Sequence, residues 1–160
     1  MNEQALQAIV DKVVREIKAP HDMTLDIALS LAEKVKAKAA SMGVKAVVAI
    51  SGRAGHPVLV QCMDDSYIAS YDVAFNKAYT VVALKMSTMT LKNLAQPGQS
   101  LYGIQFTNGG QIVIFGGGDP LIYNGKIIGG LGVSGGSEEQ DAELSAYGAS
   151  ILPNIMKGEN

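Results

Sequence analysis

The sequence predicts an α+β fold in which helices cover an antiparallel sheet. Short apolar strand patterns occur as neighbours in the chain, at residues 44–50 and 56–63 and again at 121–123 and 126–134. Segments with helical periodicity precede, separate and follow these two hairpins. Hairpins with helices inserted between them favour an antiparallel sheet packed on helices, rather than the parallel sheet of alternating strand–helix units.

The composition favours a single globular domain and excludes several classes of protein. The chain has 160 residues, of which 48% are hydrophobic and 18% charged, and this suits one domain with a real core. A net charge of −2 gives no basic footprint for nucleic acid, and the single cysteine, Cys62, excludes an internal disulfide framework. No apolar run is long enough to cross a bilayer, and the N-terminus lacks a secretion signal. We therefore expect a cytoplasmic protein without nucleic-acid or membrane partners.

Two helices are predicted before the first strand. Residues 2–18 carry an apolar stripe at helical spacing, and Ala19-Pro20 ends this helix because the residue before proline disfavours the α region. The stripe consists of Leu6, Ile9, Val10, Val13, Val14 and Ile17. The second helix is expected to begin after Thr24, whose hydroxyl can cap it, and to end near Gly43.

The remaining elements complete a sheet of five strands. After the first hairpin, helices are predicted at 67–84, 88–95 and 101–106. Strands follow at 111–115, 121–123 and 126–134, the last two joined by the turn Asn124-Gly125. Ser137 is expected to cap a final helix that runs to about Leu152.

A series of motifs between about residues 23 and 152 resembles the haem-binding family typified by HbpS and GlcG. That family includes the C-terminal domain of PduO-type corrinoid adenosyltransferases. The resemblance is carried by the order and spacing of several motifs, namely Gly55-His56, 69–74, Gly109-Gly110, 117–120, 125–129, 132–135 and Gln140-Asp141. This chain has Arg53-Ala54-Gly55 where the family often has an acidic residue and two glycines before the histidine.

The resemblance implies a profilin-like α/β/α sandwich with a five-stranded antiparallel sheet. It also implies homo-oligomers, often octamers, and haem binding in several members, but no settled reaction. Haem is therefore the expected cofactor, ahead of a corrinoid. The corrinoid adenosyltransferase domain is not recognised in this sequence, so its activity is not expected.

Haem binding requires an axial ligand, an apolar slot and cations for the propionates. The only imidazoles are His21, at the joint before the second helix, and His56, at the first hairpin turn. Each is a candidate ligand of the haem iron, and each has the alternative role of a solvated loop histidine. Met86, Met89 and Cys62 are softer alternatives, although Cys62 alternates within a strand and is expected to be buried and inert.

Arg53, Lys77 and Lys85 are the candidate partners of the propionates. Gly117 and Gly118 are candidates to lie against a flat ligand, and close strand packing is their main alternative role. The loop around them lacks the lysine of a phosphate-binding loop and the spacing of a dinucleotide fingerprint. The acidic residues Glu138, Glu139 and Asp141 suit the N-terminal end of a helix without any catalytic role.

The helix at 2–18 resembles the encapsulation peptides of bacterial microcompartment cargo. The resemblance implies two parts, an amphipathic N-terminal helix in residues 1–19 and a GlcG/HbpS-like domain in residues 20–157. Residues 1–18 would dock their apolar stripe into a groove of a shell protein of propanediol- or ethanolamine-type metabolism. Alternatively, the stripe packs on its own domain or on a sister subunit.

Two other functions remain open at this stage. One is an enzyme acting on a small metabolite, with a pocket near Asp72, Lys77 and the glycines at 117–118. The other is a structural oligomer without a small ligand. The sequence favours a binding protein over a classical enzyme, because no nucleophilic triad and no zinc-ligand spacing is evident.

Overall fold

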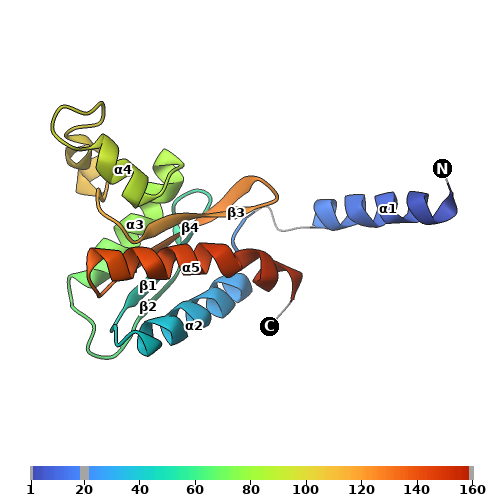
Figure 1. The fold of residues 1–160 in the computed structure, drawn as a ribbon, viewed down its shortest axis with the longest axis horizontal. Coiled ribbons are helices and arrows are strands. Elements are labelled where there is room, and N and C mark those ends of the chain that lie inside the picture. Colours follow the sequence, from blue (N-terminus) through green and yellow to red (C-terminus); the bar gives the residue numbers. More distant parts are fainter. Residues whose placement is uncertain (1, 19–21, 159–160) are drawn as a thin grey trace.

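The computed structural model describes residues 2–18 and 22–158. Helices α1 (Glu3–Lys18) and α2 (Leu25–Ser41) precede the hairpin of β1 (Val47–Gly52) and β2 (Pro57–Cys62), as Figure 1 shows. Helices α3 (Ser70–Leu84) and α4 (Thr88–Leu94) follow, and then the single turns η1 (Ile104–Phe106) and η2 (Asn108–Gly110). The chain continues through β3 (Gly118–Tyr123), β4 (Lys126–Ser134) and α5 (Glu138–Lys157). None of the described helices is both long and apolar enough to span a bilayer.

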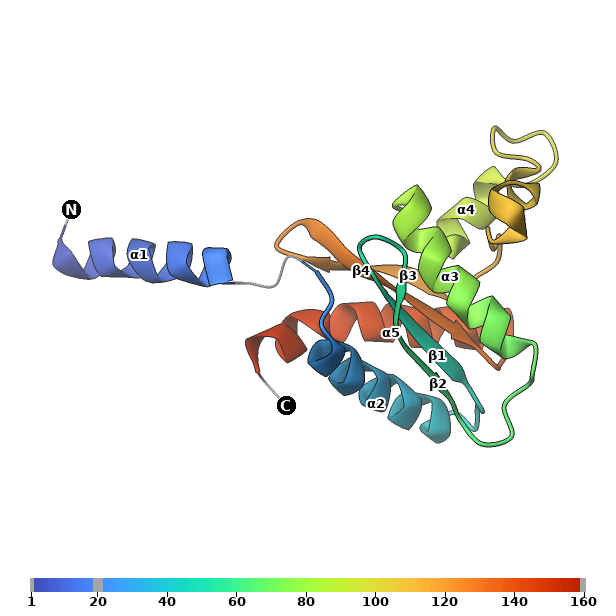
Figure 2. The ribbon, with the colours of Figure 1, turned by 180° about the vertical axis from the view of Figure 1, so that it is seen from behind.

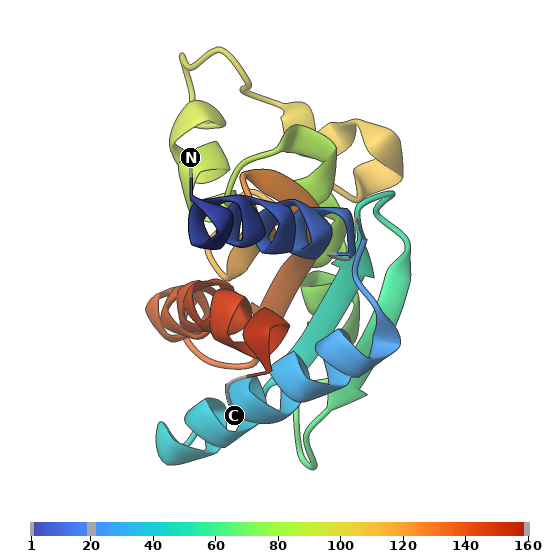
Figure 3. The same cartoon turned by 90° about the vertical axis from the view of Figure 1, so that its right-hand side faces the viewer.

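The strands form an antiparallel sheet in the order β2-β1-β4-β3, with helices packed on both faces. Helices α2 and α5 cover one face, where Leu31 and Leu144 pack with Ile50 of β1 in the main core cluster. Helix α3 covers the other face, where Ala74 and Ala78 pack on Val47 and Ala49 (Figure 2). Figure 3 shows the three layers nearly end-on. The predicted α+β class is confirmed.

The predicted number of strands is wrong, because the sheet has four strands and not five. The segment 111–115 contains the short apolar run of a strand, Ile112 to Phe115, but it is bound to α3 and not to the sheet. The Thr80 hydroxyl accepts a hydrogen bond from Val113 N at 3.0 Å and lies 3.3 Å from the carbonyl oxygen of Gln111. One buried side chain thus provides the backbone partners that a neighbouring strand would otherwise supply.

The predicted helix ends are largely confirmed by the observed caps. Thr24 accepts a hydrogen bond from Ile27 N, and Gly43 follows the end of α2 with a φ of 71°. Ser137 and Gln140 form a reciprocal capping box at the start of α5. This helix continues through Pro153 to Lys157 and so exceeds its expected length. The helix expected at 101–106 is reduced to the turn η1.

Glycines in β4 allow α3 to lie very close to the sheet. A Cβ on Gly130 would collide with the carbonyl oxygen of Ala78, and one on Gly132 with that of Ala74. Neither glycine has a positive φ, so the requirement is for space and not for an unusual backbone conformation. The Gly-dense sequence of β4 therefore sets the spacing of one whole layer of the fold.

We predict that Gly132→Ala lowers the free energy of unfolding by about 1–3 kcal/mol, because the new methyl group would have to push a helix backbone away from the sheet. Urea unfolding followed by circular dichroism would measure the loss. Ala146→Ser, at an exposed position on α5, is the matched control and should stay within about 0.5 kcal/mol of the native protein. Equal stability of the two variants would contradict the close contact.

Candidate functional site

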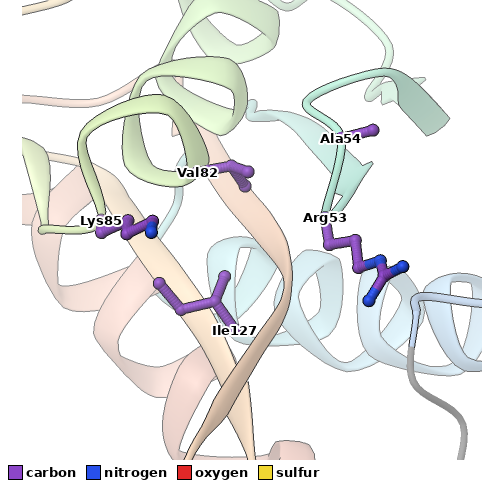
Figure 4. Close-up of a pocket in the computed structure, with 5 residues that line it drawn as sticks. All are labelled: Arg53, Ala54, Val82, Lys85 and Ile127. Atoms are coloured by element: carbon purple, nitrogen blue, oxygen red, sulfur yellow. The ribbon is translucent and has the colours of Figure 1, made fainter.

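A cleft lies between the β1–β2 turn, the end of α3 and the start of β4. It has a volume of about 290 Å³ and is lined by Arg53, Ala54, Val82, Lys85 and Ile127. Figure 4 shows the apolar side chains of Val82 and Ile127 between the two cations, with Lys85 on one side and Arg53 on the other. The cleft therefore combines an apolar floor with two separated positive charges.

Local backbone geometry places both cations at this cleft. Arg53 belongs to a tight turn in which Gly55 N donates to the carbonyl oxygen of Gly52, and Gly55 adopts a φ of 79°. Lys85 follows the last residue of α3 in a left-handed conformation with a φ of 56°. A hairpin turn and a helix end thus bring together residues that are far apart in the sequence.

Asp22 connects the chain before α2 to this cleft. Its Oδ1 accepts hydrogen bonds from Arg53 N and from Met23 N, each at 2.8 Å. Met23 N also donates to the carbonyl oxygen of Ile128 in β4 at 2.9 Å. The Asp22 carboxylate lies 3.8 Å from Arg53 Nε, and both side chains are exposed, so this ion pair adds little stability. Asp22 therefore fixes the start of the domain at the rim of the cleft mainly through backbone contacts.

Of the two candidate histidines, only His56 lies within the described residues. His56 is exposed and lies on the same hairpin turn as Arg53, where its carbonyl oxygen accepts from Gly52 N at 2.9 Å. His21 lies outside the described residues, but it is the sequence neighbour of Asp22.

The third predicted cation, Lys77, lies in a different place. Its side chain is fully buried, and Nζ donates to the carbonyl oxygen of Val133 at 2.7 Å and to Asp141 Oδ2 at 3.1 Å. The Phe115 ring covers the ammonium group, with 5.0 Å between Nζ and the ring centroid. Lys77 thus links α3, β4 and α5 across the interior.

Burial dominates the electrostatics of this pair. Desolvation lowers the pKa of Lys77, against the opposing influence of the carboxylates of Asp141 and Glu138. Desolvation also raises the pKa of Asp141, against the opposing influence of Lys77 and the Gly136 amide. Each charge depends on the other, because neither can be solvated by water.

Gly117 and Gly118 pack against Lys77 and leave no space for a side chain of their own. A Cβ on Gly117 would lie 2.6 Å from Lys77 Nζ, and one on Gly118 would lie 3.2 Å from Lys77 Cβ. Asp72 is exposed on α3, whereas Lys77 points into the interior. The expected polar pocket formed by Asp72, Lys77 and the glycines is therefore absent from the described residues, and close packing is the role that the geometry gives to the glycines.

Cys62 does not have the expected environment. It is exposed at the end of β2 and not buried, because β2 is an edge strand and the residue lies at its terminus. Met86 is partly buried, and Met89 is more exposed on α4. Sequence alternation alone did not distinguish an edge strand from a central one.

Comparison with known proteins identifies the family. Residues 23–150 match the family described as haem degrading protein HbpS-like. The chain belongs to the HbpS-like family. An uncharacterised Citrobacter freundii protein, from the dhaT–dhaS intergenic region, is 47% identical over 77% of this chain and 87% of its own length.

Two further similar proteins carry PduO in their names. The corrinoid adenosyltransferase PduO of Salmonella typhimurium is 35% identical over 88% of this chain, which spans only 44% of that protein. The crystal structure of a PduOC:heme complex superposes with a TM-score of 0.77 at 35% identity, covering 81% of this chain and 94% of the other. The HbpS-like domain therefore corresponds to part of PduO and not to the whole enzyme.

We predict that Lys77→Met destabilises the protein by about 3–5 kcal/mol, because it leaves the Asp141 carboxylate buried without a cation. The double variant Lys77→Met/Asp141→Asn removes both charges and keeps an acceptor for the Gly136 amide, so it should recover part of this loss. Chemical denaturation of both variants would provide the measurement. A double variant less stable than Lys77→Met would contradict the assignment of an interdependent pair.

Proposed function

We propose that this chain is a homo-oligomeric haem- or tetrapyrrole-binding protein that serves as an accessory factor of a bacterial microcompartment. The observation that carries the haem part is the cleft, because Val82 and Ile127 offer an apolar surface to a flat macrocycle and Arg53 and Lys85 offer cations to its anionic substituents. The structural likeness to the PduOC:heme complex supports the same ligand.

The residue types of the cleft fit haem. A guanidinium or an ammonium can each neutralise a propionate, and Val82 and Ile127 suit the face of the ring. The volume of about 290 Å³ lies just below the range of roughly 300–1,000 Å³ that is typical of ligand pockets. One chain therefore covers only part of a macrocycle, and a second chain would cover the rest. This is the reason to propose a homo-oligomer, of which the octamer is one form.

The axial ligand of the proposed site is His21 or His56. Asp22 holds the residues that follow His21 at the rim of the cleft, and His56 lies on the turn of Arg53. Bound haem would supply ligand binding or electron transfer at its iron. The protein would orient the ring, neutralise its propionates and limit access of water. A corrinoid is a weaker candidate, because the chain spans less than half of PduO.

We do not propose that this protein is an enzyme acting on a small metabolite. Lys77 and the neighbouring glycines, which were expected to line such a pocket, are buried against one another. The alternative of a structural oligomer without a ligand differs from our proposal in one measurable property, the binding of haemin.

Haemin titration followed at the Soret band tests the proposed site. Arg53→Gln and Lys85→Gln should each weaken haemin binding about fivefold, as expected for the loss of one exposed ion pair worth about 1 kcal/mol. Lys157→Gln, an exposed site on α5, is the charge-matched control and should bind normally. His21→Ala or His56→Ala should shift the band position. No band for the native protein would contradict haem binding, and unchanged binding in both cation variants would contradict this cleft.

The proposed microcompartment role rests on α1. Five apolar residues of its stripe are at least 41% exposed and are not buried against any described residue, namely Leu6, Ile9, Val10, Val13 and Val14. Helix α1 extends away from the other elements in Figure 1. Within this proposal, residues 1–19 act as an address for a shell protein, and residues 20–157 form the binding domain.

Deletion of residues 1–18 tests the address. The shortened protein should unfold at the same urea concentration, since the deleted apolar residues bury nothing in the domain, and it should no longer sediment with purified shell proteins. Leu6→Asp should reduce sedimentation in the full chain, whereas Gln4→Asp, which adds the same charge at a non-stripe position, should not. A shortened protein that fails to fold would show instead that α1 belongs to the core.

A further inference from the structure

The tip of the β3–β4 hairpin is a two-residue turn with an unusual backbone. Asn124 and Gly125 lie between the paired residues Tyr123 and Lys126, and their φ values are 49° and 73°. Two central residues with positive φ are typical of a type I′ turn, whose twist suits a short hairpin. Figure 1 shows this turn at the end of the hairpin labelled β3. Both residues are exposed, so water reaches the Asn124 side chain.

An exposed Asn-Gly pair can react with itself. The side-chain carbon Cγ of an asparagine lies within reach of the backbone nitrogen of the next residue, and attack by this nitrogen closes a cyclic imide. A glycine at the next position has no Cβ to hinder the approach. The sequence contains two such pairs, Asn108-Gly109 and Asn124-Gly125, and both asparagines have a positive φ. Only their contacts distinguish them.

The Asn108 amide is bound to another part of the molecule. Its Nδ2 donates to Tyr79 Oη on α3 at 3.3 Å, and its Oδ1 lies 2.9 Å from Thr107 Oγ1. The flanking backbone is bonded as well, because Gly110 N donates to the carbonyl oxygen of Thr107 and Gln111 N donates to that of Asn108. Ring closure at Asn108 must therefore first break the contact with Tyr79.

The Asn124 amide lacks these restraints. Within residues 2–18 and 22–158, neither its side chain nor Gly125 N makes a hydrogen bond. A Cβ added to Gly125 would meet nothing within 4 Å, so the surroundings leave room for the Asn124 side chain to turn onto the backbone.

We propose that Asn124 is a site of spontaneous deamidation and that Asn108 is protected from it. The Gly125 nitrogen loses its proton to solvent and bonds to Asn124 Cγ, and the Cγ–Nδ2 bond breaks as ammonia leaves. Water then opens the imide at one of its two carbonyl carbons. One opening leaves aspartate at position 124, and the other leaves isoaspartate, in which the main chain continues through the side-chain carboxyl carbon. The reaction consumes one water and needs no oxidant or reductant.

The isoaspartyl product alters the hairpin as well as the charge. It adds one carbon to the main chain of a turn that joins the directly paired Tyr123 and Lys126. The next residue, Ile127, pairs with Ile122 and lines the cleft. We therefore expect this product to bind haemin less well than the native protein. This consequence rests on the proposed function, whereas the deamidation itself does not.

Timed incubation of the full native chain, followed by peptide mass spectrometry, tests the assignment. Chymotrypsin cleaves after Phe115 and Tyr123 and so separates the two sites. The mass gain of an amide-to-acid change should accumulate about fivefold faster at Asn124 than at Asn108, which is the factor that one hydrogen bond contributes. The same chain unfolded in urea is the reference, and there the two sites should react at similar rates.

Removal of one hydroxyl tests the protection of Asn108. Tyr79→Phe keeps the ring that packs on Gly55 but removes the acceptor of the Asn108 amide. It should raise the rate at Asn108 about fivefold and leave the rate at Asn124 unchanged. Tyr102→Phe, at an exposed tyrosine, is the matched control and should change neither rate. An unchanged rate at Asn108 in Tyr79→Phe would show that this contact does not protect it.

The outcomes separate this inference from the proposed function. Equal rates at the two sites of the folded protein, or no gain at Asn124 while the unfolded chain gains, would overturn it. Haemin binding by the aged protein is compared with Asn124→Asp, which carries the same charge on an ordinary backbone. Equal binding would show that the altered turn does not affect the cleft. If the native protein binds no haemin, the proposed function fails and the deamidation result stands.

Discussion

The contact between α3 and β4 determines the arrangement of the rest of the molecule. Gly130 and Gly132 let the helix backbone rest directly on the strand, and Lys77 extends from the helix past the strand to Asp141 on α5. Since α3 is held at this distance, its last turn places Val82 and Lys85 beside Ile127 of the same strand. The geometry of the cleft therefore derives from a packing constraint several residues away.

The cost of burying Lys77 is offset only by its complete set of partners. A buried ammonium is strongly unfavourable unless it is paired and hydrogen-bonded. Here a carboxylate, a backbone carbonyl and an aromatic ring surround it. Such an arrangement fixes one relative position of α3, β4 and α5, because any displacement would leave a charge without a partner.

Local signals in the sequence predicted much of the fold. Thr24 and Ser137 cap helices as expected, and Asn124-Gly125 turns the second hairpin. The fifth strand was wrong because a short apolar run indicates that side chains are buried, and does not indicate which groups bind the backbone. At 111–115 those groups are bonded to Thr80, a residue about thirty positions earlier whose hydroxyl has no signature in a hydrophobic pattern.

The sequence predicted which types of residue line the candidate site better than it predicted which individual residues lie together there. Arg53 and Lys85 line one cleft because a turn and a helix end place them there, and both positions can be inferred from local patterns. Lys77 was expected beside them, but its partner Asp141 is 64 residues away, and no local rule connects the two. Asp22 was missed for the same reason, since its contact with Arg53 spans 31 residues.

The attachment of residues 111–115 to Thr80 has an evolutionary consequence. The loop that follows α4 leads to a segment that is bound to α3 and adds no strand to the sheet. The hydrogen bonds of the sheet therefore do not depend on the length of this loop. A change of length between residues 96 and 108 would therefore leave the alignment of the hairpins unchanged. The chain is fixed again beyond the Gly109-Gly110 motif, where Val113 N binds the Thr80 hydroxyl.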